Sequence, residues 1–491
     1  TRLRVPAGAG GPPAPETIRA QAGAMLAIER IGLPPALLSA LKHLAALHNP
    51  VFYEKERLRL STHATPRFVR CYEEDLEWLR LPRALAARAA DLAAEAGSTL
   101  VIETRCSNPD PVPLSFTGTL DAQQAAAVAD LADHGLSVLV APPGTGKTVM
   151  ACALIARHGV PTLVVVDRKP LLDQWRARLR DLLGLDRKQI GQLGGGAKPS
   201  GVVDLAMAQS LARRDDIATL TAGYGLVVVD ECHHIPAVTF ERAVKHMPVG
   251  RWIGLTATPY RRDGLEGIIT MHCGPVRHQI DARDTPAATS LSLQLLVHET
   301  TFRPDATDEL HIQDLFRGLV EEEERTGQIA DDVAAALEAG RNCLVLTQWT
   351  EHLDRLQEVL ADRGHPALVL RGGMGKKARA AVLESLAKPR PDGGVLLLAT
   401  GSYLGEGFDC PALDTLFLAF PLAFKGRIVQ YVGRVIRTHD GKSDVQVHDY
   451  VDAAVPVLAR MHAKRLPAYA SLGFPTPGGS KRSRTNRARP H

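Results

Sequence analysis

Cysteine is scarce and scattered in this sequence, which argues against two common ways of stabilising or building a site. The 491 residues hold seven cysteines, widely separated and without a C-x-x-C pair: Cys71, Cys106, Cys152, Cys232, Cys273, Cys343 and Cys410. An odd number at this spacing disfavours a zinc cluster and a disulfide framework, so we expect no zinc site. Unpaired thiols fit a reducing compartment best, and we expect the protein to be cytoplasmic.

Long apolar runs are also missing. No run approaches the ~18 residues of a membrane-spanning helix, so we expect no contact with a membrane. The first residues, TRLRVPAGAGGPPAP, lack the apolar segment of a secretory signal. They also lack an initiator Met, as expected of a fragment or a processed product. A further domain upstream of this sequence is therefore an open alternative.

A strong charge of one sign is the third absence. Lys and Arg total 58 against 54 Asp and Glu, a net charge of +4, which is a weak signal for an anionic partner. The remaining composition, 45% apolar and 23% charged, is that of a globular protein and excludes collagen and general disorder. The length suits two large domains with additional segments.

From about residue 116, short apolar runs alternate with helical stretches, and the same rhythm returns after about 330. Strands that alternate with helices predict parallel α/β domains, here two of them. The stretch 17–48 has apolar residues at helical spacing and predicts short helices. The expected organisation is a flexible, helical segment (1–48), an accessory domain (49–115), a first α/β domain (116–285), a linker (286–315), a second α/β domain (316–466) and a basic, disordered tail (467–491).

A glycine-rich loop follows the apolar run SVLV and precedes an apolar helix. The loop APPGTGKT covers 141–148, and its Gly144 and Gly146 let backbone N–H groups turn toward phosphate oxygens. Lys147 can reach the β and γ phosphates of ATP, and the Thr148 hydroxyl can bind Mg²⁺. Ala141 stands where the strict phosphate-loop pattern has glycine. ATP and Mg²⁺ are therefore the expected nucleotide and metal.

Two adjacent acids end a second apolar run, LVVVD. We expect Asp230 to hold Mg²⁺ and Glu231 to orient and deprotonate the attacking water. His233 and His234 follow at a spacing too tight for a structural zinc site, and we place them beside the acids on a coupling surface.

These residues resemble superfamily 2 helicases and translocases, which are built from two RecA-like domains. The further motifs stand in the family's order: LDAQQ (120–124), DRKPLLDQW (167–175), DLAMAQSL (204–211), DECH (230–233), TATP (256–259), LVLTQW (344–349), TGSYLGEGFDCP (400–411) and QYVGRVIR (430–437). The resemblance covers about 116–465. The stretches NPVFYEKERLRLSTHATPRF and GEGFDCPALDTLFLAFP place the chain near an XPB-like and restriction-type branch found in bacterial conflict and defence systems, with a defence- or primase-system partner.

The resemblance implies a role for each matched residue. The implied catalytic residues are Lys147, Glu231, Gln430, Arg434 and Arg437. The implied ATP-binding residues are Gln124, which reads adenine, Pro142, Pro143, Gly144, Thr145, Gly146, Lys147, Thr148 and Asp409. Thr148 and Asp230 hold Mg²⁺, and Thr256 and Thr258 couple hydrolysis to movement. The implied nucleic-acid contacts are Arg168, Gln209, Ser210, Gln348, Thr400 and Gly401. The less favoured alternatives are that each of these residues is a polar strand end and that QYVGRVIR is a basic surface helix.

The segment 49–83 interleaves arginines with aromatic residues. Arginines with aromatics can bind phosphates and stack on bases, but an amphipathic packing segment would look the same, and we weigh the two equally. The function expected for the whole chain is an ATP-dependent helicase or translocase, with DNA favoured over RNA by the resemblance alone. The alternatives are a nucleotide-gated nucleic-acid clamp and an RNA helicase.

Overall fold

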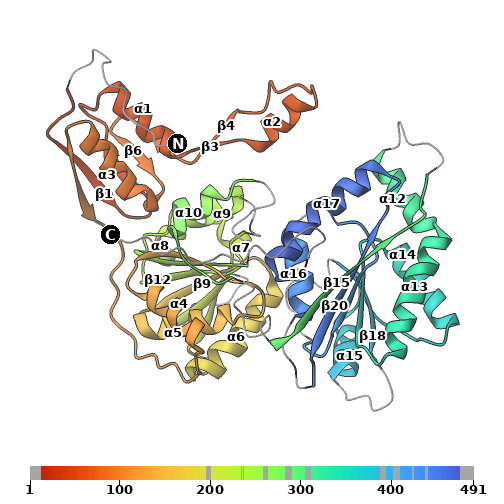
Figure 1. The fold of residues 1–491 in the computed structure, drawn as a ribbon. Helices are drawn as coiled ribbons and strands as arrows, with labels where there is room; N and C mark the ends of the chain where they lie inside the picture. Colours follow the sequence, from red (N-terminus) through yellow and green to blue (C-terminus); the bar gives the residue numbers. More distant parts are fainter. Residues whose placement is uncertain are drawn as a thin grey trace, which may run out of the picture. The chain divides into compact units, whose positions relative to one another are not determined.

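The chain forms two compact units, Thr1–Ile280 and Asp281–His491 (Figure 1). The computed structural model describes residues 13–475 apart from 195–198, 200, 234, 236, 258–263, 282–289, 305–310, 388–393, 402–409, 423–424, 437–438 and 440, and within helices it leaves out the side chains of 376, 383, 387, 425–427 and 430. The predicted organisation of two α/β domains is confirmed, because each unit contains a sheet of parallel strands.

The first unit begins with a small mixed sheet and its helices. From here on we use the name accessory domain for these residues, 13–107, in place of the expected range 49–115. Its strand order is β5-β6-β2-β1-β7, and two helices pack on it. The elements are β1 (Thr17–Ala22), β2 (Leu26–Glu29), α1 (Pro35–Leu44), β5 (Glu73–Glu74), β6 (Trp78–Leu81), α3 (Ala86–Glu95) and β7 (Thr99–Thr104). Because β1 and β2 pair with β7 and β6, the predicted boundary at residue 48 cuts through one domain.

The prediction of helices over 17–48 is wrong for its first half. Residues 17–29 form β1 and β2, and only α1 is helical. The physical reason is a two-residue alternation: Ile18 and Ala20 are buried, while Thr17 and Arg19 are exposed. That period places alternate side chains on opposite faces of a sheet, so the apolar residues reach the core as strand residues.

A projecting segment, which we call the arm (residues 46–70), leaves the accessory domain between α1 and β5. It consists of β3 (Ala46–His48), α2 (Pro50–Arg57), a loop and β4 (Phe68–Arg70), with β3 and β4 paired antiparallel. Figure 1 shows α2, β3 and β4 extending away from α1 and α3. Asn49 begins α2 by accepting a hydrogen bond from the backbone N–H of Val51, as N-cap residues do.

The rest of the first unit is a seven-stranded parallel sheet of order β10-β11-β9-β12-β13-β8-β14. Its strands are β8 (Leu136–Val140), β9 (Thr162–Val166), β10 (Ile190–Leu193), β11 (Val203–Met207), β12 (Leu226–Val229), β13 (Arg251–Thr256) and β14 (Val276–Gln279). Its helices are α4 (Ala122–Ala132), α5 (Lys147–His158), α6 (Lys169–Leu183), α7 (Ala208–Leu211), α8 (Ile217–Thr221), α9 (Ala237–Val244) and α10 (Gly267–Cys273). The central strands are apolar throughout because helices cover both faces.

The accessory domain shares a core with one face of this sheet. Helices α4, α5 and α6 pack on one face, while α7 to α10 and the accessory domain pack on the other. The buried Arg83 joins the two parts: its guanidinium lies 4.0 Å from the centre of the Trp252 ring and donates to the carbonyl oxygens of Val244 (2.7 Å) and Val249 (3.3 Å). Stacking and hydrogen bonding together offset the burial of this cation.

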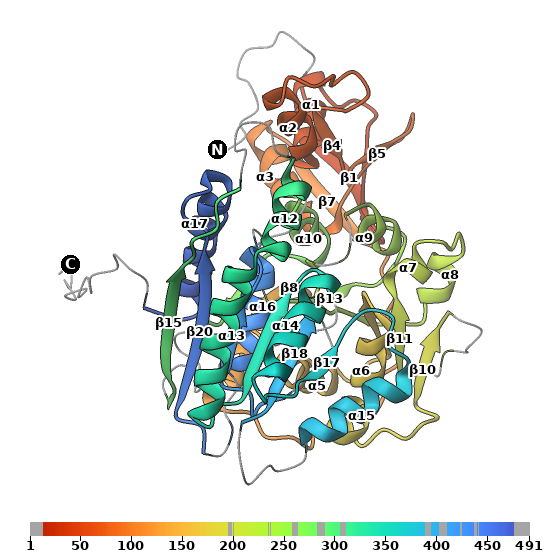
Figure 2. The same ribbon diagram turned by 90° about the vertical axis from the view of Figure 1, so that its right-hand side faces the viewer.

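The second unit contains a six-stranded parallel sheet of order β15-β20-β19-β16-β18-β17, covered on both faces (Figure 2). The strands are β15 (Ser292–Glu299), β16 (Cys343–Thr347), β17 (Leu368–Leu370), β18 (Leu396–Thr400), β19 (Thr415–Leu418) and β20 (Asp444–Val451). The helices are α12 (Ile312–Glu321), α13 (Glu323–Glu338), α14 (Thr350–Asp362), α15 (Lys376–Ala387), α16 (Lys425–Val435) and α17 (Pro456–Ser471).

Two boundaries predicted for this unit are wrong. The expected linker (286–315) contains β15, whose mixed polarity reflects its place at the edge of the sheet beside β20. The expected tail begins inside α17, where buried Arg465 pairs with Asp449 (2.7 Å) and Tyr469 donates to the same carboxylate (2.7 Å). Tyr469, Leu472 and Phe474 are buried, so the domain extends to the end of the described residues; 476–491 lie outside them.

Candidate nucleotide site and nucleic-acid contacts

The loop after β8 has the backbone shape that its glycines predict. Gly144 and Gly146 adopt left-handed φ angles of 87° and 79°, and Gly146 caps the start of α5. A Cβ atom on Gly146 would lie 2.7 Å from Nε2 of Gln124, so no other residue fits there without displacement. The Thr145 hydroxyl donates to the carbonyl oxygen of Pro142 (2.7 Å) and closes the loop. The loop therefore leads directly into the N-terminus of α5, the end of a helix that carries partial positive charge.

The lysine of this loop is held between the loop and Glu231, which follows β12, the second strand from β8 in the sheet. The Nζ of Lys147 donates to the carbonyl oxygen of Ala141 (3.0 Å) and lies 3.4 Å from Oε1 of Glu231. Both side chains are largely buried, with exposed fractions of 9% and 15%. A cation and a carboxylate held this close, away from bulk water, are placed to act on a phosphate group together.

Asp230 and Glu231 follow β12. The buried carboxylate of Asp230 accepts hydrogen bonds from the indole of Trp175 (2.8 Å) and from the backbone N–H of Glu231 (2.9 Å). Burial raises the pKa of Asp230, and the adjacent Glu231 raises it further, against the opposing effects of Trp175 and Lys147. Glu231 itself has a left-handed φ of 45°, a strained conformation of the kind that clusters at functional sites.

A contact path leads from the acids to the next strand of the sheet. Nδ1 of His233 lies 3.4 Å from Oε2 of Glu231 and 2.8 Å from the hydroxyl of Thr256, the last residue of β13. His233 belongs to the predicted acid box, DECH (230–233), and Thr256 belongs to the predicted coupling motif, TATP (256–259). The second predicted coupling residue, Thr258, and His234 lie outside the described residues.

Gln124, which we predicted to read adenine, lies against the phosphate loop. Its Nε2 donates to the carbonyl oxygen of Thr145 (3.1 Å), and its Oε1 accepts from the backbone N–H of Asp121 (3.1 Å). Asp121 in turn caps α4 by accepting from the Gln124 backbone, which completes a capping box. The amide therefore ties the start of α4 to the loop, and its role toward adenine stays a prediction.

Two of the three predicted nucleic-acid contacts of the first unit, Arg168 and Gln209, are joined by Asp167, which was not predicted as a site residue. The buried Asp167, which follows β9, accepts from Nε of Arg168 (3.2 Å) and from Nε2 of Gln209 (2.5 Å). Ser210 follows Gln209 in α7. Asp167 opens the motif that contains Arg168, and a carboxylate at the end of a buried strand is a signal that could have identified it.

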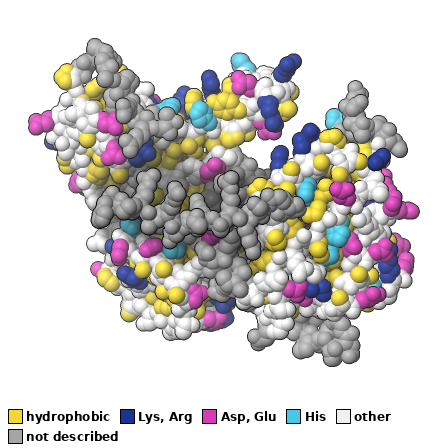
Figure 3. All heavy atoms as spheres, in the orientation of Figure 1, with side chains coloured by type: hydrophobic (Ala, Val, Ile, Leu, Met, Phe, Trp, Pro, Cys, Tyr) yellow, Lys and Arg dark blue, Asp and Glu magenta, His cyan; other side chains and the backbone are white. Residues whose placement is uncertain are grey.

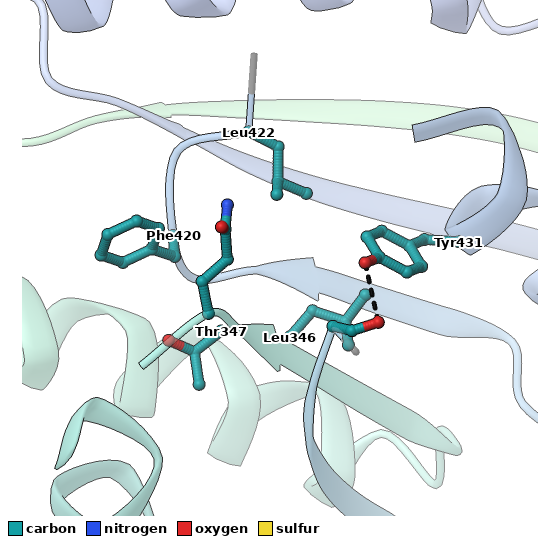
Figure 4. A pocket seen from close by; sticks show the side chains of 7 residues that line it. Leu346, Thr347, Phe420, Leu422 and Tyr431 are labelled. Carbon is teal, nitrogen blue, oxygen red and sulfur yellow. Dashed lines mark hydrogen bonds between the residues drawn. The ribbon is translucent and has the colours of Figure 1, made fainter. Parts of the chain in front are cut away.

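Two of the three predicted contacts of the second unit, Gln348 and Gly401, line a small pocket together with Leu346, Thr347, Phe420, Leu422 and Tyr431 (Figure 4). Gln348 follows β16, and Thr400 ends β18, so the carboxyl ends of neighbouring strands bring them together. The Tyr431 hydroxyl donates to the carbonyl oxygen of Gly401 (2.8 Å) and ties α16 to this edge.

The predicted phosphate-contacting helix is α16, and Arg434 lies near its end, partly exposed. Tyr431, Val432 and Val435 are buried, so an apolar face holds the helix on the sheet. Asp409, Arg437 and the side chain of Gln430 lie outside the described residues.

Three side chains in the second unit form a cluster that could not be predicted, because the three residues are far apart in the sequence. His298 (β15), Asp332 (α13) and His448 (β20) offer ligand atoms within 4.8 Å of one another. Nε2 of His298 lies 3.1 Å from Nδ1 of His448, and Tyr450 donates to Asp332 (2.8 Å). The expectation of no zinc site therefore remains untested.

Comparison with known proteins identifies the two α/β domains. Residues 117–261 match the family described as the res subunit of type III restriction enzymes, and residues 328–439 match the helicase conserved C-terminal domain. The chain belongs to the superfamily 2 helicases. Two RecA-like domains and ATP hydrolysis are the properties of this family, as the motifs predicted.

Among relatives of this helicase is "Probable helicase D10" of Escherichia phage T5, 27% identical over 68% of this chain and 71% of that protein. Another is "DNA 3'-5' helicase XPB" of Mycobacterium tuberculosis, 27% identical over 69% of this chain and 62% of the relative. A solved structure titled "ATP-dependent Type ISP restriction-modification enzyme LlaBIII bound to DNA" has the same fold over 72% of this chain and 30% of that one, with a TM-score of 0.54 and 16% identity.

No helix in the described part of the helicase is long and apolar enough to cross a membrane. The helicase spans 62% of the mycobacterial relative, which is less than two thirds of that protein's length.

Proposed function

We propose that this helicase uses ATP hydrolysis to move along DNA. The observation that carries the proposal is the contact path from Lys147 through Glu231 and His233 to Thr256, which links the phosphate loop to the end of a neighbouring strand. Loss of the γ-phosphate would change the contacts of Glu231, and through His233 and Thr256 it would shift the segment that follows β13. DNA is favoured because several relatives are named as DNA helicases.

Each residue of the first unit has a chemical task in this proposal. Lys147 neutralises the transferred phosphate, and the backbone N–H groups of the loop bind its oxygens. Glu231 accepts the proton of the attacking water, and His233 holds its carboxylate in position. Pro142 and Pro143 shape the loop.

Mg²⁺ is the proposed metal, and the donor set fits it. Asp230 and Thr148 offer hard oxygen ligands, and the raised pKa of Asp230 reflects burial beside a second carboxylate, a situation that a bound cation relieves. When bound, the ion would neutralise charge on the phosphates. The hydrogen bond from Trp175 fixes the orientation of Asp230 toward the loop.

The second unit supplies the remaining groups in this proposal. Arg434 and Arg437 would stabilise the charge that develops on the γ-phosphate, Gln430 would orient the water, and Asp409 would bind the ribose. Arg168, Gln209, Ser210, Gln348, Thr400 and Gly401 would bind the phosphates and sugars of the DNA track, giving little base specificity.

The wider setting is proposed as well. The restriction-type family match supports a role in bacterial defence, with a defence- or primase-system partner. None of the seven cysteines, all of which lie among the described residues, forms a disulfide, which supports a reducing cytoplasm.

The decisive experiment measures ATPase activity with single-stranded DNA, duplex DNA and RNA in parallel, together with strand separation. We expect stimulation by DNA and ATP-dependent movement. Stimulation by RNA alone would make the protein an RNA helicase. DNA binding that changes with nucleotide, without movement or strand separation, would make it a clamp.

A further inference from the structure

The arm carries a segregated positive charge. Between residues 46 and 70 it has five basic side chains (Lys55, Arg57, Arg59, Arg67 and Arg70) against Glu54 and Glu56, a net charge of +3 without histidines. The rest of the accessory domain, 13–45 and 71–107, has seven basic and nine acidic residues, a net charge of −2. The positive charge is thus concentrated on the projecting segment, although the whole chain is almost neutral.

The arm is exposed to an unusual degree. Helix α2 buries no residue, and Arg57, Arg59, Arg67 and Arg70 are all exposed. Leu58 and Leu60 are 54% and 57% exposed and alternate with these arginines. Figure 3 shows basic and hydrophobic side chains sharing the surface of the arm. A packing segment would bury its apolar residues, so the packing alternative for this part of 49–83 loses its support.

Polar and ring contacts, in place of a core, hold the arm in shape. The Tyr53 hydroxyl lies 2.8 Å from Nδ1 of His48 and accepts from Nε of Arg67 (3.2 Å). Lys55 donates to the hydroxyl of Thr65 (2.7 Å), which ties α2 to the loop that follows it. The basic side chains are therefore presented by a defined scaffold.

The root of the arm packs on the segment that follows the coupling motif. A Cβ atom added to Gly264 would lie 3.0 Å from Cγ of Pro50, and one added to Gly267 would lie 2.8 Å from a methyl group of Leu47. Gly267 begins α10, the first described helix after Thr256. The arm thus rests on the part of the first unit that the proposed contact path reaches.

We propose that the arm is a DNA-binding element that grips the phosphate backbone through Arg57 and Arg59. The proposal rests on the proposed DNA-dependent function. DNA is the occupant that the local charge favours, because exposed arginines on a positive segment are attracted to phosphates. Leu58 and Leu60 lie beside the two arginines and offer apolar contact to sugars and bases.

The test uses the full chain with two double variants of equal charge change. Arg57→Ala with Arg59→Ala removes the grip; Arg19→Ala with Arg88→Ala removes two exposed arginines from the accessory domain outside the arm. Binding of labelled single-stranded DNA and of the matching duplex is measured from low to high salt without nucleotide. Loss of two phosphate contacts lowers the slope of log affinity against log salt by about 1.4 on single strands or about 1.8 on duplex.

We expect the reduced slope in the arm variant and the wild-type slope in the control. The strand type that shows the reduction identifies the form of DNA that the arm holds. Equal slopes in both variants on both DNAs overturn the proposal and leave the apolar side chains as a protein-binding surface. DNA-stimulated ATPase of the wild type, measured in the same samples, tests the proposed function separately: its absence would refute that function whatever the slopes show.

Discussion

The two parallel sheets hold their predicted site residues in different ways. In the first unit, a chain of contacts joins Lys147 to Glu231, Glu231 to His233 and His233 to Thr256, so these predicted residues form one connected cluster. In the second unit, Gln348 and Gly401 line a pocket at the ends of β16 and β18, and half-buried Arg434 lies near the end of α16. The predicted groups of the first unit are thus joined by direct side-chain contacts, whereas those described in the second unit are brought together by the ends of neighbouring strands.

The largest expected effect tests the dependence of the first unit on the second. Arg434→Ala should lower nucleic-acid-stimulated ATPase by about 10³–10⁵, as loss of an arginine finger does, while nucleotide binding persists. The measurement is ATPase at saturating DNA and low salt. Arg460→Ala, an exposed arginine on α17, is the control and should stay near wild type. Recovery of the Arg434 variant at low salt would make this residue a track contact instead.

The next effect concerns the connected cluster of Lys147, Glu231, His233 and Thr256 in the first unit. Glu231→Gln should keep ATP bound but slow hydrolysis by about 10²–10⁴, because an amide cannot accept the proton of water. Nucleotide binding and turnover are measured on the same sample, with Glu241→Gln on α9 as the control. Turnover at the wild-type rate would remove Glu231 from the chemistry and leave it as a partner of Lys147.

The contrast between the units also explains what could be predicted from the sequence. The phosphate loop and the acid box were predicted because local chemistry determines them: glycines at left-handed positions, a lysine beside them, and acids at the end of an apolar strand. The partners that complete the site, Trp175 on Asp230 and Asp167 between Arg168 and Gln209, depend on tertiary contacts between strands and helices. The position of Asp167 at the end of an apolar strand is a local signal, but no local pattern specifies which side chains contact it or Asp230.

The segments that were predicted wrongly have different physical reasons. The polarity of β15 reflects its place at the edge of the sheet beside β20, and neighbours in a sheet are not visible in a linear sequence. The two-residue alternation of β1 was visible, but a helical spacing of apolar residues was preferred to it. The start of the tail was misassigned because α17 is anchored by the ion pair of Arg465 with buried Asp449, a contact that composition does not reveal.

A smaller effect concerns the hydrogen bond that the indole of Trp175 donates to the carboxylate of Asp230. Trp175→Phe removes the indole donor and should raise the pKa of Asp230 further, because that donor lowers it. A higher pKa keeps more of the carboxyl protonated, so the acid limb of the ATPase profile should move to higher pH. Turnover at neutral pH should fall by roughly tenfold, the value of one hydrogen bond to a charged group. Trp78→Phe in β6 is the control; an unchanged profile in the Trp175 variant would show that Asp230 is oriented without the indole.

The smallest expected effect compares the acid stability of the two units. Burial lowers the pKa of His272 in the first unit, and of His352 and His448 in the second, to about 3 each. Below the ordinary pKa of 6.5 the unfolded chain binds protons that the folded chain refuses, so stability falls as the pH drops toward 3. Burial also lowers the pKa of one further histidine in each unit, His158 in the first and His462 in the second. In the first unit, burial raises the pKa of the carboxyl groups of Asp230 and Glu241. The folded chain therefore protonates these two carboxyl groups more readily than the unfolded chain does, which opposes the loss of stability in acid.

The second unit should therefore lose more stability on acidification, by roughly 1 kcal/mol between pH 7 and pH 6. Hydrogen exchange, read separately in the strands of each sheet, measures the difference. His352→Met should reduce the loss in the second unit and leave the first unchanged, and His272→Met should do the reverse, because neither ring nitrogen of His272 has a hydrogen-bond partner among the described residues. Equal losses in both units, unchanged by either variant, would show that these histidines bind protons equally in the folded and the unfolded chain and that other groups cause the loss of stability.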